Sequence, residues 1–238
     1  TAQWNGVGDS GAIDISVGDG DDEAITCILP SFKGDLFVAK RTKLYRISGY
    51  TAETFTVQLI SSGIGCVGPN AYAVVDQDDI IFLSDRGIHS LSATANFGDF
   101  EGKFLSADIQ PTVNTKFKKS RRKYAWGGYI PTLDSVAFAI TDTQESETIN
   151  KAVWLYNLSL GAWYKWVGLE CESMIVANDT DKKRPYFGTN TTRVAKGEVG
   201  ANYDSNTSGT QTAINMIIQT GLLYPDGNPF TEKAFKYF

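Results

Sequence analysis

The sequence predicts an all-β protein, a β-propeller of about four to six four-stranded antiparallel blades, and three observations lead to this expectation. The 238-residue chain is rich in glycine and aromatic residues, with 23 Gly, 13 Phe, 11 Tyr and 5 Trp. Short apolar runs bounded by turn-forming residues follow one another almost throughout. A hairpin pattern also recurs, with starts near positions 35, 79, 134 and 184. These intervals are close to the ~40–50 residues of one propeller blade.

The apolar runs predict strands along the whole chain, and no window carries a clear helical stripe with a 3.6-residue period. Residues 12–17 alternate apolar and polar side chains, which is typical of a half-buried strand. Residues 211–218 could form a short helix instead of a strand, although they are rich in β-branched residues. The other predicted strands cover residues 24–29, 36–39, 44–47, 55–60, 71–75, 80–83, 88–91, 124–130, 136–141, 153–158, 163–167, 173–177, 185–188 and 212–219.

The repeat is clearest between residues 35–47 and 79–91, which align without a gap at an offset of 44 positions. Each copy has four apolar residues, a four-residue polar hairpin tip and a second strand. Looser copies begin near residues 134 and 184. A single blade cannot bury both of its faces, so repeated blades are expected to pack around a common axis. A sandwich or a long meander with accidental similarity is the alternative.

The domain expectation is that residues 1–200 form propeller blades and residues 201–238 form the last blade or the start of a following β-domain. The chain starts with Thr1 and ends in a run that reads as a strand, so we expect a piece of a longer protein. No stretch approaches the ~18 apolar residues of a membrane-spanning helix, so no membrane span is expected.

Charge is unevenly distributed along the chain, whose formal net charge is −5. An acidic turn near the start and a basic strip in the middle are candidates for self-assembly or for a charged partner, including phosphate. The alternative for the strip is a solvated connection between blades, and for the turn an ordinary turn between strands. The acidic turn contains Asp19, Asp21, Asp22 and Glu23, and the basic strip contains Lys116, Lys118, Lys119, Arg121, Arg122 and Lys123.

Catalytic and metal-binding motifs are few, and we expect no enzyme activity, no metal and no cofactor. The single histidine, His89, aligns with Tyr45 in the repeat, which is an ordinary strand position. Residues 8–11 resemble the nucleophile turn of trypsin-like proteases, but they precede that histidine rather than follow it. The acidic turn lacks the ligand spacing of a calcium-binding EF-hand. No phosphate-binding or dinucleotide-binding glycine motif occurs.

Three cysteines are too far apart in the sequence to indicate a metal site or a redox motif. Cys27, Cys66 and Cys171 form no CxxC pair, and each lies among small or apolar residues. We therefore expect buried free thiols.

Several segments resemble the β-propeller of bacteriophage tail proteins. Residues 15–22 and 24–26 match the "gdGd-x-I-t" turn and strand of the nozzle (tail tubular protein B) family of short-tailed phages and of the related neck DNA-stabilisation proteins. Residues 35–49 match the "LlvfK" and "si-Y-x-i-x-G" strands of that family. Residues 63–70 and 81–88 match its "iGc-x-a-p-n" and "v-f-l-S-x-d-G-i" pieces. The resemblance covers about residues 10–195, whereas full-length members carry further β-domains.

The resemblance implies a structural role in the virion, at the phage tail or neck. Such proteins form rings, commonly hexamers, next to other tail, adaptor or fibre proteins, and double-stranded DNA passes through them at ejection. A negative wall lets DNA slide, whereas a basic lining would hold it, so a net charge of −5 is compatible with a conduit. The basic strip would then face a neighbouring protein rather than the channel.

Two other functions remain as alternatives. The first is a propeller that binds host-surface carbohydrate through exposed aromatic rings, although most of these rings are expected in the blade core. The second is a propeller enzyme, which the lone histidine and the missing motifs disfavour. The candidate stacking residues are Trp154, Tyr156, Trp163, Tyr164 and Trp166.

Overall fold

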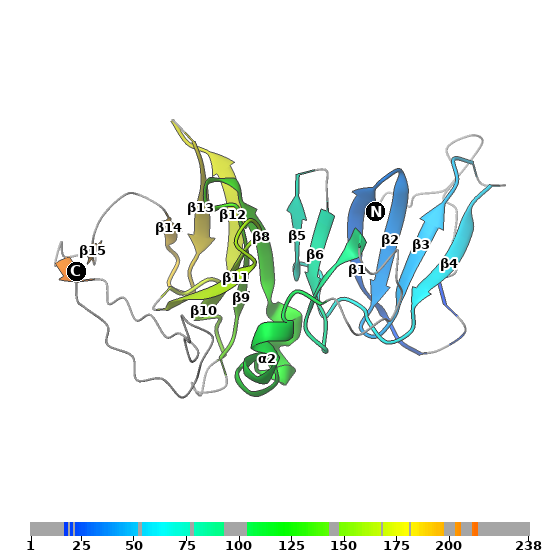
Figure 1. Ribbon diagram of the computed structural model, residues 1–238, viewed down its shortest axis with the longest axis horizontal. Helices are drawn as coiled ribbons and strands as arrows, with labels where there is room; N and C mark the ends of the chain where they lie inside the picture. Colours follow the sequence, from blue (N-terminus) through cyan, green and yellow to red (C-terminus); the bar gives the residue numbers. More distant parts are fainter. Residues whose placement is uncertain are drawn as a thin grey trace, which may run out of the picture. The chain divides into compact units, whose positions relative to one another are not determined.

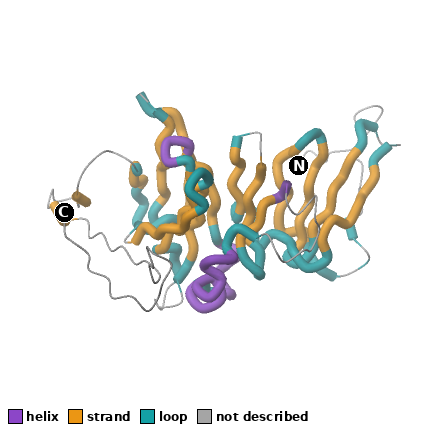
Figure 2. The backbone as a smooth tube through the Cα atoms, viewed as in Figure 1, coloured by secondary structure: helices purple, strands orange, loops and turns teal. Residues whose placement is uncertain are grey.

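The computed structural model describes residues 17–18, 20, 22–51, 54–76, 79–92, 104–142, 148–167, 169–180 and 182–197, and the backbone of residues 203–205 and 211–213. Strands are the main regular element of this part of the chain, and helices are few and short (Figure 2). The chain divides into two compact units, Thr1–Glu198 and Val199–Phe238. The second unit contains a two-stranded antiparallel pair, β15 (Tyr203–Ser205) and β16 (Gln211–Ala213).

Four antiparallel sheets follow one another in the first unit, and within each sheet the strands lie in sequence order (Figure 1). This confirms the prediction of an antiparallel β-protein. The first sheet contains β1 (Ile25–Phe32), β2 (Asp35–Lys40), β3 (Leu44–Ser48) and β4 (Thr56–Ser61), and the second contains β5 (Tyr72–Val75), β6 (Asp79–Leu83) and β7 (Ile88–Ser90). The third contains β8 (Trp126–Ile130), β9 (Ser135–Ile140), β10 (Ala152–Asn157) and β11 (Ala162–Val167), and the fourth contains β12 (Ser173–Asn178), β13 (Lys183–Gly188) and β14 (Val194–Lys196).

The hairpin repeat predicted from the sequence is present, and its two best copies share one strand register. In the first sheet Val38 lies opposite Tyr45 and Ala39 opposite Leu44. In the second sheet the equivalent pairs, 44 positions later, are Phe82 with His89 and Leu83 with Ile88. The looser copies correspond to the hairpins β9–β10 and β13–β14. Each copy therefore forms the second and third strands of its sheet.

A helical connection between the second and third sheets was not predicted from the sequence. It consists of the 3-10 turn η3 (Ala107–Ile109), the helix α2 (Gln110–Lys116) and the 3-10 helix η4 (Lys119–Tyr124). Proline in the first turn of α2 suits a position that needs no backbone N–H donor. The prediction of a strand over residues 124–130 is wrong at its start, because Tyr124 ends η4 and β8 begins at Trp126. A further 3-10 turn, η5 (Pro131–Leu133), joins β8 to β9.

Two apolar clusters join the sheets face to face. One cluster contains residues of the first three sheets, and the other contains residues of the third and fourth. The strand β9 is buried along its whole length and contributes to both, because successive side chains of a strand point to opposite faces. Phe138 belongs to the first cluster, whereas Ala137 and Ala139 belong to the second. The third sheet is therefore covered on both of its faces.

The first strands of neighbouring sheets pack closely, β5 against β8 and β8 against β12. Two consecutive glycines in β8 permit this approach. A Cβ atom at Gly127 would lie 2.4 Å from the backbone oxygen of Tyr72, which begins β5. A Cβ atom at Gly128 would lie 2.6 Å from the Cε atom of Met174 on β12. A larger residue at Gly127 would therefore push the β5 backbone away, whereas at Gly128 the flexible end of the Met174 side chain would have to move.

No helix in the described part of the chain has the length and apolar character needed to cross a membrane.

Candidate functional site

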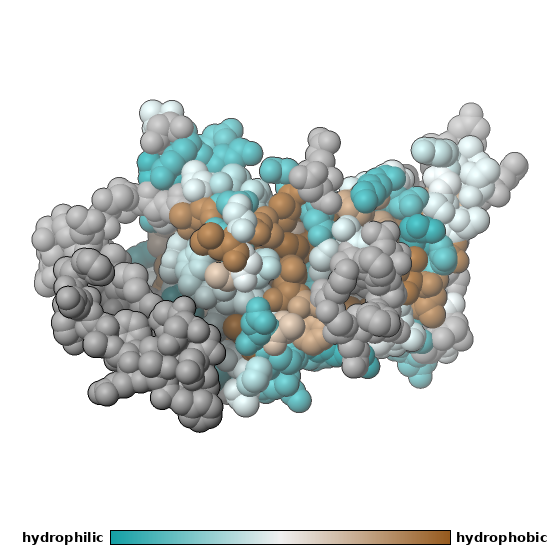
Figure 3. Space-filling model, in the orientation of Figure 1, coloured by the Kyte–Doolittle hydropathy of each residue, from teal (hydrophilic) through white to brown (hydrophobic). Residues whose placement is uncertain are grey.

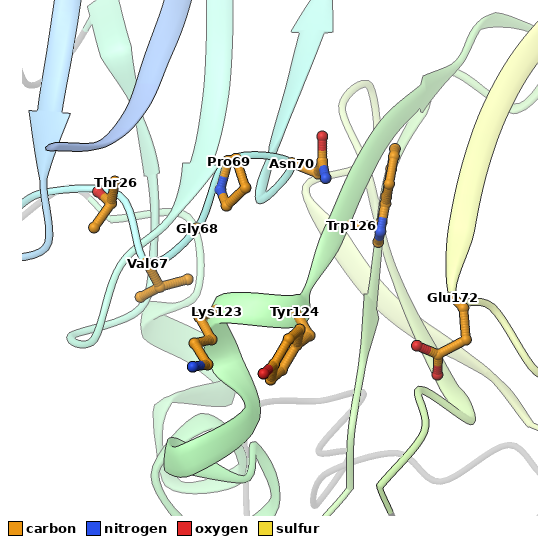
Figure 4. Close-up of a pocket in the computed structure, with 9 residues that line it drawn as sticks. All are labelled: Thr26, Val67, Gly68, Pro69, Asn70, Lys123, Tyr124, Trp126 and Glu172. Atoms are coloured by element: carbon orange, nitrogen blue, oxygen red, sulfur yellow. The ribbon is translucent and has the colours of Figure 1, made fainter.

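A pocket of about 380 Å³ lies where the first strands of the four sheets begin (Figure 4). Every sheet contributes to it. Thr26 comes from β1, the segment that precedes β5 supplies the turn at Asn70, and Trp126 begins β8. Glu172 immediately precedes β12. The complete lining is Thr26, Val67, Gly68, Pro69, Asn70, Lys123, Tyr124, Trp126 and Glu172.

Backbone contacts fix the two segments that form most of this pocket. The N–H of Gly127 donates a hydrogen bond to the Asn70 carbonyl oxygen at 2.7 Å, which ties the start of β8 to the start of β5. A Cβ atom at Gly68 would lie 2.3 Å from the carbonyl oxygen of Lys123, so this close approach needs glycine. The turn before β5 and the end of η4 are thereby held side by side.

A buried asparagine positions the opposite side of the pocket. Asn150 has no exposed surface, and its side-chain amide donates to the carbonyl oxygen of Tyr124 at 2.8 Å. Its backbone N–H donates to Oε1 of Glu172 at 2.7 Å, and its side-chain oxygen accepts from the hydroxyl of Thr141 at 2.8 Å. One residue thus holds both the Tyr124 backbone and the Glu172 carboxylate, because a buried amide requires these partners.

Two cations stand over the ring of Tyr124, which is 45% exposed. The guanidinium carbon of Arg121 lies 4.1 Å from the ring centroid and the ammonium of Lys123 lies 5.0 Å from it. Such cation–π contacts hold the ring in place, and each contributes only a modest stabilising free energy where the site is open to solvent. In Figure 4 Lys123 and Glu172 lie at opposite sides of the view, with Tyr124 and Trp126 between them.

The basic strip divides into one buried residue and five that reach the surface. Lys119 and Lys123 are exposed, and Lys116, Lys118 and Arg121 are half-buried. Arg122 is only 2% exposed, so the expectation of a continuous charged strip does not hold at this position. The physical reason is that η4 turns the Arg122 side chain toward α2 and the second sheet, where oxygen acceptors surround it.

Arg122 joins the helical connection to the hairpin tip of β6–β7. Its guanidinium donates to the carbonyl oxygens of Asp85 at 2.5 Å and Val113 at 2.9 Å. Asp85 also binds Arg41 of the neighbouring hairpin tip through two hydrogen bonds, of 2.6 and 3.0 Å. Burial lowers the pKa of Arg122, while the nearby Asp85 carboxylate opposes this shift.

The acidic turn is described only in part. Asp19 and Asp21 lie outside the described residues, and Asp22 is exposed. Glu23 accepts hydrogen bonds from the backbone N–H of Thr42 at 2.8 Å and from its hydroxyl at 2.7 Å. Glu23 therefore fastens the tip of the β2–β3 hairpin, and its contact within the chain is with that tip rather than with the basic strip.

The aromatic residues considered for carbohydrate stacking are half-buried and pack between elements. Trp154 contacts Phe117 of the helical connection, and the indole N–H of Trp163 donates to the carbonyl oxygen of Leu105 at 2.9 Å. Trp166 contacts Phe187 of the fourth sheet. Tyr156 packs on Trp163, and the Tyr164 hydroxyl donates to the Ser135 hydroxyl at 3.1 Å. These five rings serve the packing of the third sheet, as residues of a β-core usually do.

His89 lies in the protein core. It is 4% exposed, and its ring packs between the rings of Phe82 and Phe104, with centroid distances of 5.8 and 5.4 Å. Burial, assisted by the positive charge of Arg86, lowers the pKa of His89 to about 4. The imidazole is therefore neutral at pH 7.

The three cysteines are buried free thiols, as predicted. A hydrogen bond from Cys66 lowers the pKa of Cys27, and the same pairing together with burial raises the pKa of Cys66. Burial, and then the charge of Glu172, raise the pKa of Cys171 to about 12. The described residues contain no group of three or more His, Cys, Asp or Glu side chains that could hold a metal ion. The protease-like turn at residues 8–11 lies outside the described residues.

Sequence reasoning missed the pocket, because its lining comes from four separate segments. Lys123 of the basic strip is the one predicted site residue that lines it, and the Gly-Pro-Asn turn at residues 68–70 is a further local signal. Comparison with protein-family models finds no match for this chain, and comparison with curated proteins finds none of significant similarity.

Proposed function

We propose that this chain is a structural subunit of a bacteriophage tail or neck, a nozzle-like ring component that forms part of the DNA ejection conduit and its closure. In this proposal the four sheets are successive propeller blades whose first strands, β1, β5, β8 and β12, lie nearest a common axis. The packing of β5 on β8 and of β8 on β12 supports that arrangement. The shared register of the β2–β3 and β6–β7 hairpins supports it as well.

The observation that carries the proposal is the outer face of the first sheet, which belongs to neither apolar cluster. Cross-strand pairing places its side chains in two rows, because directly opposite residues share a face. Val38, Tyr45 and Ile47 in the middle are buried, whereas the flanking aliphatic residues are 37 to 61% exposed. The outer face consists of Ile28, Leu36, Val38, Tyr45, Ile47, Val57 and Leu59.

The strand β4 at the edge of this sheet strengthens the case for a protein partner. Its residues Thr56–Ser61 include no charged residue and no proline, the usual devices that keep an edge strand from pairing with another chain. Apolar surface is visible where β4 lies (Figure 3). We assign this surface to a neighbouring copy of the same chain. A heterologous contact of this kind closes into a ring when the rotation between copies is a simple fraction of a turn.

Charge supports a second contact between copies. Lys119 and Lys123 are exposed, and no acidic side chain of the described part of the chain pairs with them. The acidic turn, with exposed Asp22, offers a complementary surface on the next copy. Because both groups are open to solvent, this contact is expected to steer assembly and to weaken at high salt.

The test is the assembly state of the purified chain, measured by light scattering after gel filtration and by electron microscopy. We expect rings, most simply hexamers, for the unaltered chain, and loss of rings in Leu59→Lys, which buries a charge in the contact. Thr56→Lys is the matched control, because it puts the same charge on the same strand but on the opposite face. A chain that stays monomeric at about 100 µM, or a closed dimer, would contradict the proposal. If the two variants had equal effects, the copies would not meet through the outer face of the first sheet.

A charge-reversal experiment tests the electrostatic contact separately. Lys119→Glu combined with Arg121→Glu is expected to lower the assembled fraction at low salt and to have less effect at about 1 M salt. Lys183→Glu, an exposed lysine of β13 outside the basic strip, is the control. Unchanged assembly of the double variant at low salt would show that the basic strip has no part in ring formation.

A further inference from the structure

Two of the three buried cysteines lie side by side, although they are far apart in the sequence. Cys27 belongs to β1, and Cys66 belongs to the segment between β4 and β5. The thiol of Cys66 donates a hydrogen bond to the sulfur of Cys27. The Sγ atom of Cys66 also lies 3.2 Å from the carbonyl oxygen of Gly68. The Sγ atom of Cys27 lies 3.7 Å from the carbonyl oxygen of the next residue, Pro69, so both thiols meet the same turn.

Backbone contacts hold the two segments together on both sides of the cysteine pair. The hydroxyl of Thr26, the residue before Cys27, donates to the carbonyl oxygen of Cys66 at 2.5 Å. The N–H of Cys66 donates to the carbonyl oxygen of Lys40, on the neighbouring strand β2, at 3.0 Å. Gly65 passes so close to this same oxygen that a Cβ atom would not fit. A bond between the two sulfur atoms therefore needs little movement of the backbone.

The third cysteine is a contrast within the same chain. Burial, and then the charge of Glu172, raise the pKa of Cys171 to about 12, so this thiol keeps its proton. The hydrogen bond from Cys66 instead lowers the pKa of Cys27, although burial opposes this shift. Oxidants react with the thiolate rather than with the thiol. Cys27 is therefore the thiol prepared for oxidation, and Cys171 serves as an internal reference.

A small oxidant can approach the pair from the pocket described above. Gly68 and Pro69, whose carbonyl oxygens contact the two thiols, line this pocket, and so does Thr26 (Figure 4). Cys27 itself keeps 3% of its surface exposed. These features suit hydrogen peroxide, which is small and uncharged, whereas a bulky disulfide such as oxidised glutathione would require the core to open.

Two adjacent thiols can hold a metal ion or form a disulfide bond. A structural zinc site needs four ligands, and the described residues offer no cluster of three or more metal-binding side chains. We propose that Cys27 and Cys66 form an oxidation site, at which hydrogen peroxide joins them by a disulfide bond and ties β1 to the segment that leads into the second sheet. The proposal does not depend on the conduit role, because both thiols belong to one chain.

The reaction has two steps. In the first, the Cys27 thiolate attacks one oxygen atom of hydrogen peroxide, the O–O bond breaks, and the departing hydroxide takes up the proton that the thiol released. Cys27 then carries a sulfenic acid. In the second, the sulfur of Cys66 attacks the sulfur of Cys27, the S–O bond breaks, and the departing hydroxide takes the proton of Cys66. The two thiols have lost two hydrogen atoms, and the peroxide has been reduced to two molecules of water.

The disulfide would enclose most of the first sheet in a covalent loop. Cys27 lies in β1 and Cys66 follows β4, so β2, β3 and β4 lie between the two linked residues. Such a loop restricts the unfolded chain and thereby stabilises the folded one. We expect oxidation to raise the midpoint of thermal unfolding by about 5 to 10 °C. Reduction with dithiothreitol should return the midpoint to its original value.

The experiment treats the folded full chain with an excess of hydrogen peroxide, blocks the remaining thiols with iodoacetamide in urea, and maps cross-linked peptides by mass spectrometry. We expect the number of alkylated thiols to fall from three to one, with a single cross-link between Cys27 and Cys66. Peroxide treatment of the chain in urea is the control. There the three cysteines meet at random, so cross-links to Cys171 should appear as well.

Two variants separate the steps of the reaction. Cys66→Ala should stop the reaction at the sulfenic acid of Cys27, which dimedone labels. Cys171→Ala is the matched control, because it also removes a buried thiol but should leave the cross-link intact. The cross-link map of the unaltered chain decides the proposal even where a variant folds poorly.

Four results would overturn the proposal. The first is three alkylated thiols after peroxide treatment of the folded chain. The second is a sulfenic acid on Cys27 that persists in the unaltered chain without a cross-link. The third is a cross-link to Cys171 that is as frequent in the folded chain as in urea. The fourth is an unchanged or lowered thermal midpoint of the oxidised chain, because the bond would then strain the fold instead of tying β1 in place.

Discussion

The hairpins β2–β3 and β6–β7 have the same geometry but differ at the residues through which they meet. Both tips are closed by the same backbone hydrogen bond, from Lys40 N–H to the Lys43 oxygen at 2.9 Å and from Ser84 N–H to the Gly87 oxygen at 2.7 Å. These two bonds are also 44 positions apart. The repeat is therefore preserved down to individual hydrogen bonds.

The difference lies at the second tip position. Arg41 and Asp85 occupy equivalent places in the two hairpins, and they bind each other at 2.6 Å. Identical residues at this position would place like charges together, which would be unfavourable. The repeated pattern thus gives both hairpins the same shape. The difference at one position, Arg41 in one and Asp85 in the other, allows an ion pair between them.

A second pair of equivalent residues also differs between the two hairpins, in this case in its surroundings. Tyr45 and His89 occupy the same strand position, and both are buried. Tyr45 lies on the outer face of the first sheet, whereas His89 is enclosed between two phenylalanine rings. The same register therefore puts Tyr45 on a face outside the two apolar clusters and His89 inside one of the protein's aromatic contacts.

The largest expected effect concerns Arg122, which secures only the second tip. Arg122→Met should lower the free energy of unfolding by about 3 kcal/mol, because buried carbonyl oxygens lose their donor and Asp85 loses a neighbouring cation. The measurement is the midpoint of urea unfolding. Lys119→Met is the control and should change stability by less than about 0.5 kcal/mol. An equally small effect of Arg122→Met would mean that the second tip does not depend on the helical connection.

An effect of similar size should appear for His89 as the pH falls. Its pKa of about 4 in the folded chain lies below its ordinary 6.5, so the unfolded chain binds more protons between these values. Stability should therefore decrease as the pH falls from 6.5 to 4, by about 3 kcal/mol from this residue. His89→Phe should remove that part of the pH dependence, measured as the difference between the two unfolding curves. Parallel curves for both proteins would contradict the assignment.

A smaller effect is expected at the equivalent position of the first hairpin. The hydroxyl of Tyr45 is buried and has no hydrogen-bond partner among the described residues. Tyr45→Phe should therefore leave stability unchanged or raise it by up to about 1 kcal/mol. Thermal unfolding at pH 7 would measure this. A loss of more than about 1 kcal/mol would show that the hydroxyl is bonded in solution.

The smallest effect should come from the contact between the two tips themselves. The side chains of Arg41 and Asp85 are 40% and 36% exposed, so solvent screens their attraction. Arg41→Ala should cost no more than about 1 kcal/mol at low salt, and less at about 1 M salt. Urea unfolding at the two salt concentrations measures the change. A cost that does not depend on salt would indicate a packing role for the Arg41 side chain.

The sequence was informative where structure repeats. A gapless match between residues 35–47 and 79–91 predicted two hairpins with the correct strands, because strand periodicity and turn residues are local properties. The helical connection could not be predicted in the same way. Helix α2 has seven residues and buries one of its own side chains, Val113, so it shows no apolar stripe.

The site was less accessible to sequence reasoning than the fold. The charge of Arg122 suggested a solvated residue, and only tertiary contacts with Val113 and Asp85 bury it. The pocket unites residues as far apart as Thr26 and Glu172, whose proximity depends on how whole sheets pack. No pattern within a single segment carries that information.

The consecutive glycines of β8 have a consequence for architecture. Gly127 admits β5 on one side of the strand, and Gly128 admits β12 on the other. The backbone contact at Gly127 therefore limits the angle between the second and third sheets. In any radial arrangement that angle decides how many sheets complete a circle. A methyl group at Gly127 would meet the Tyr72 backbone and widen that angle, so in such an arrangement one missing carbon atom would bear on the number of sheets in the circle.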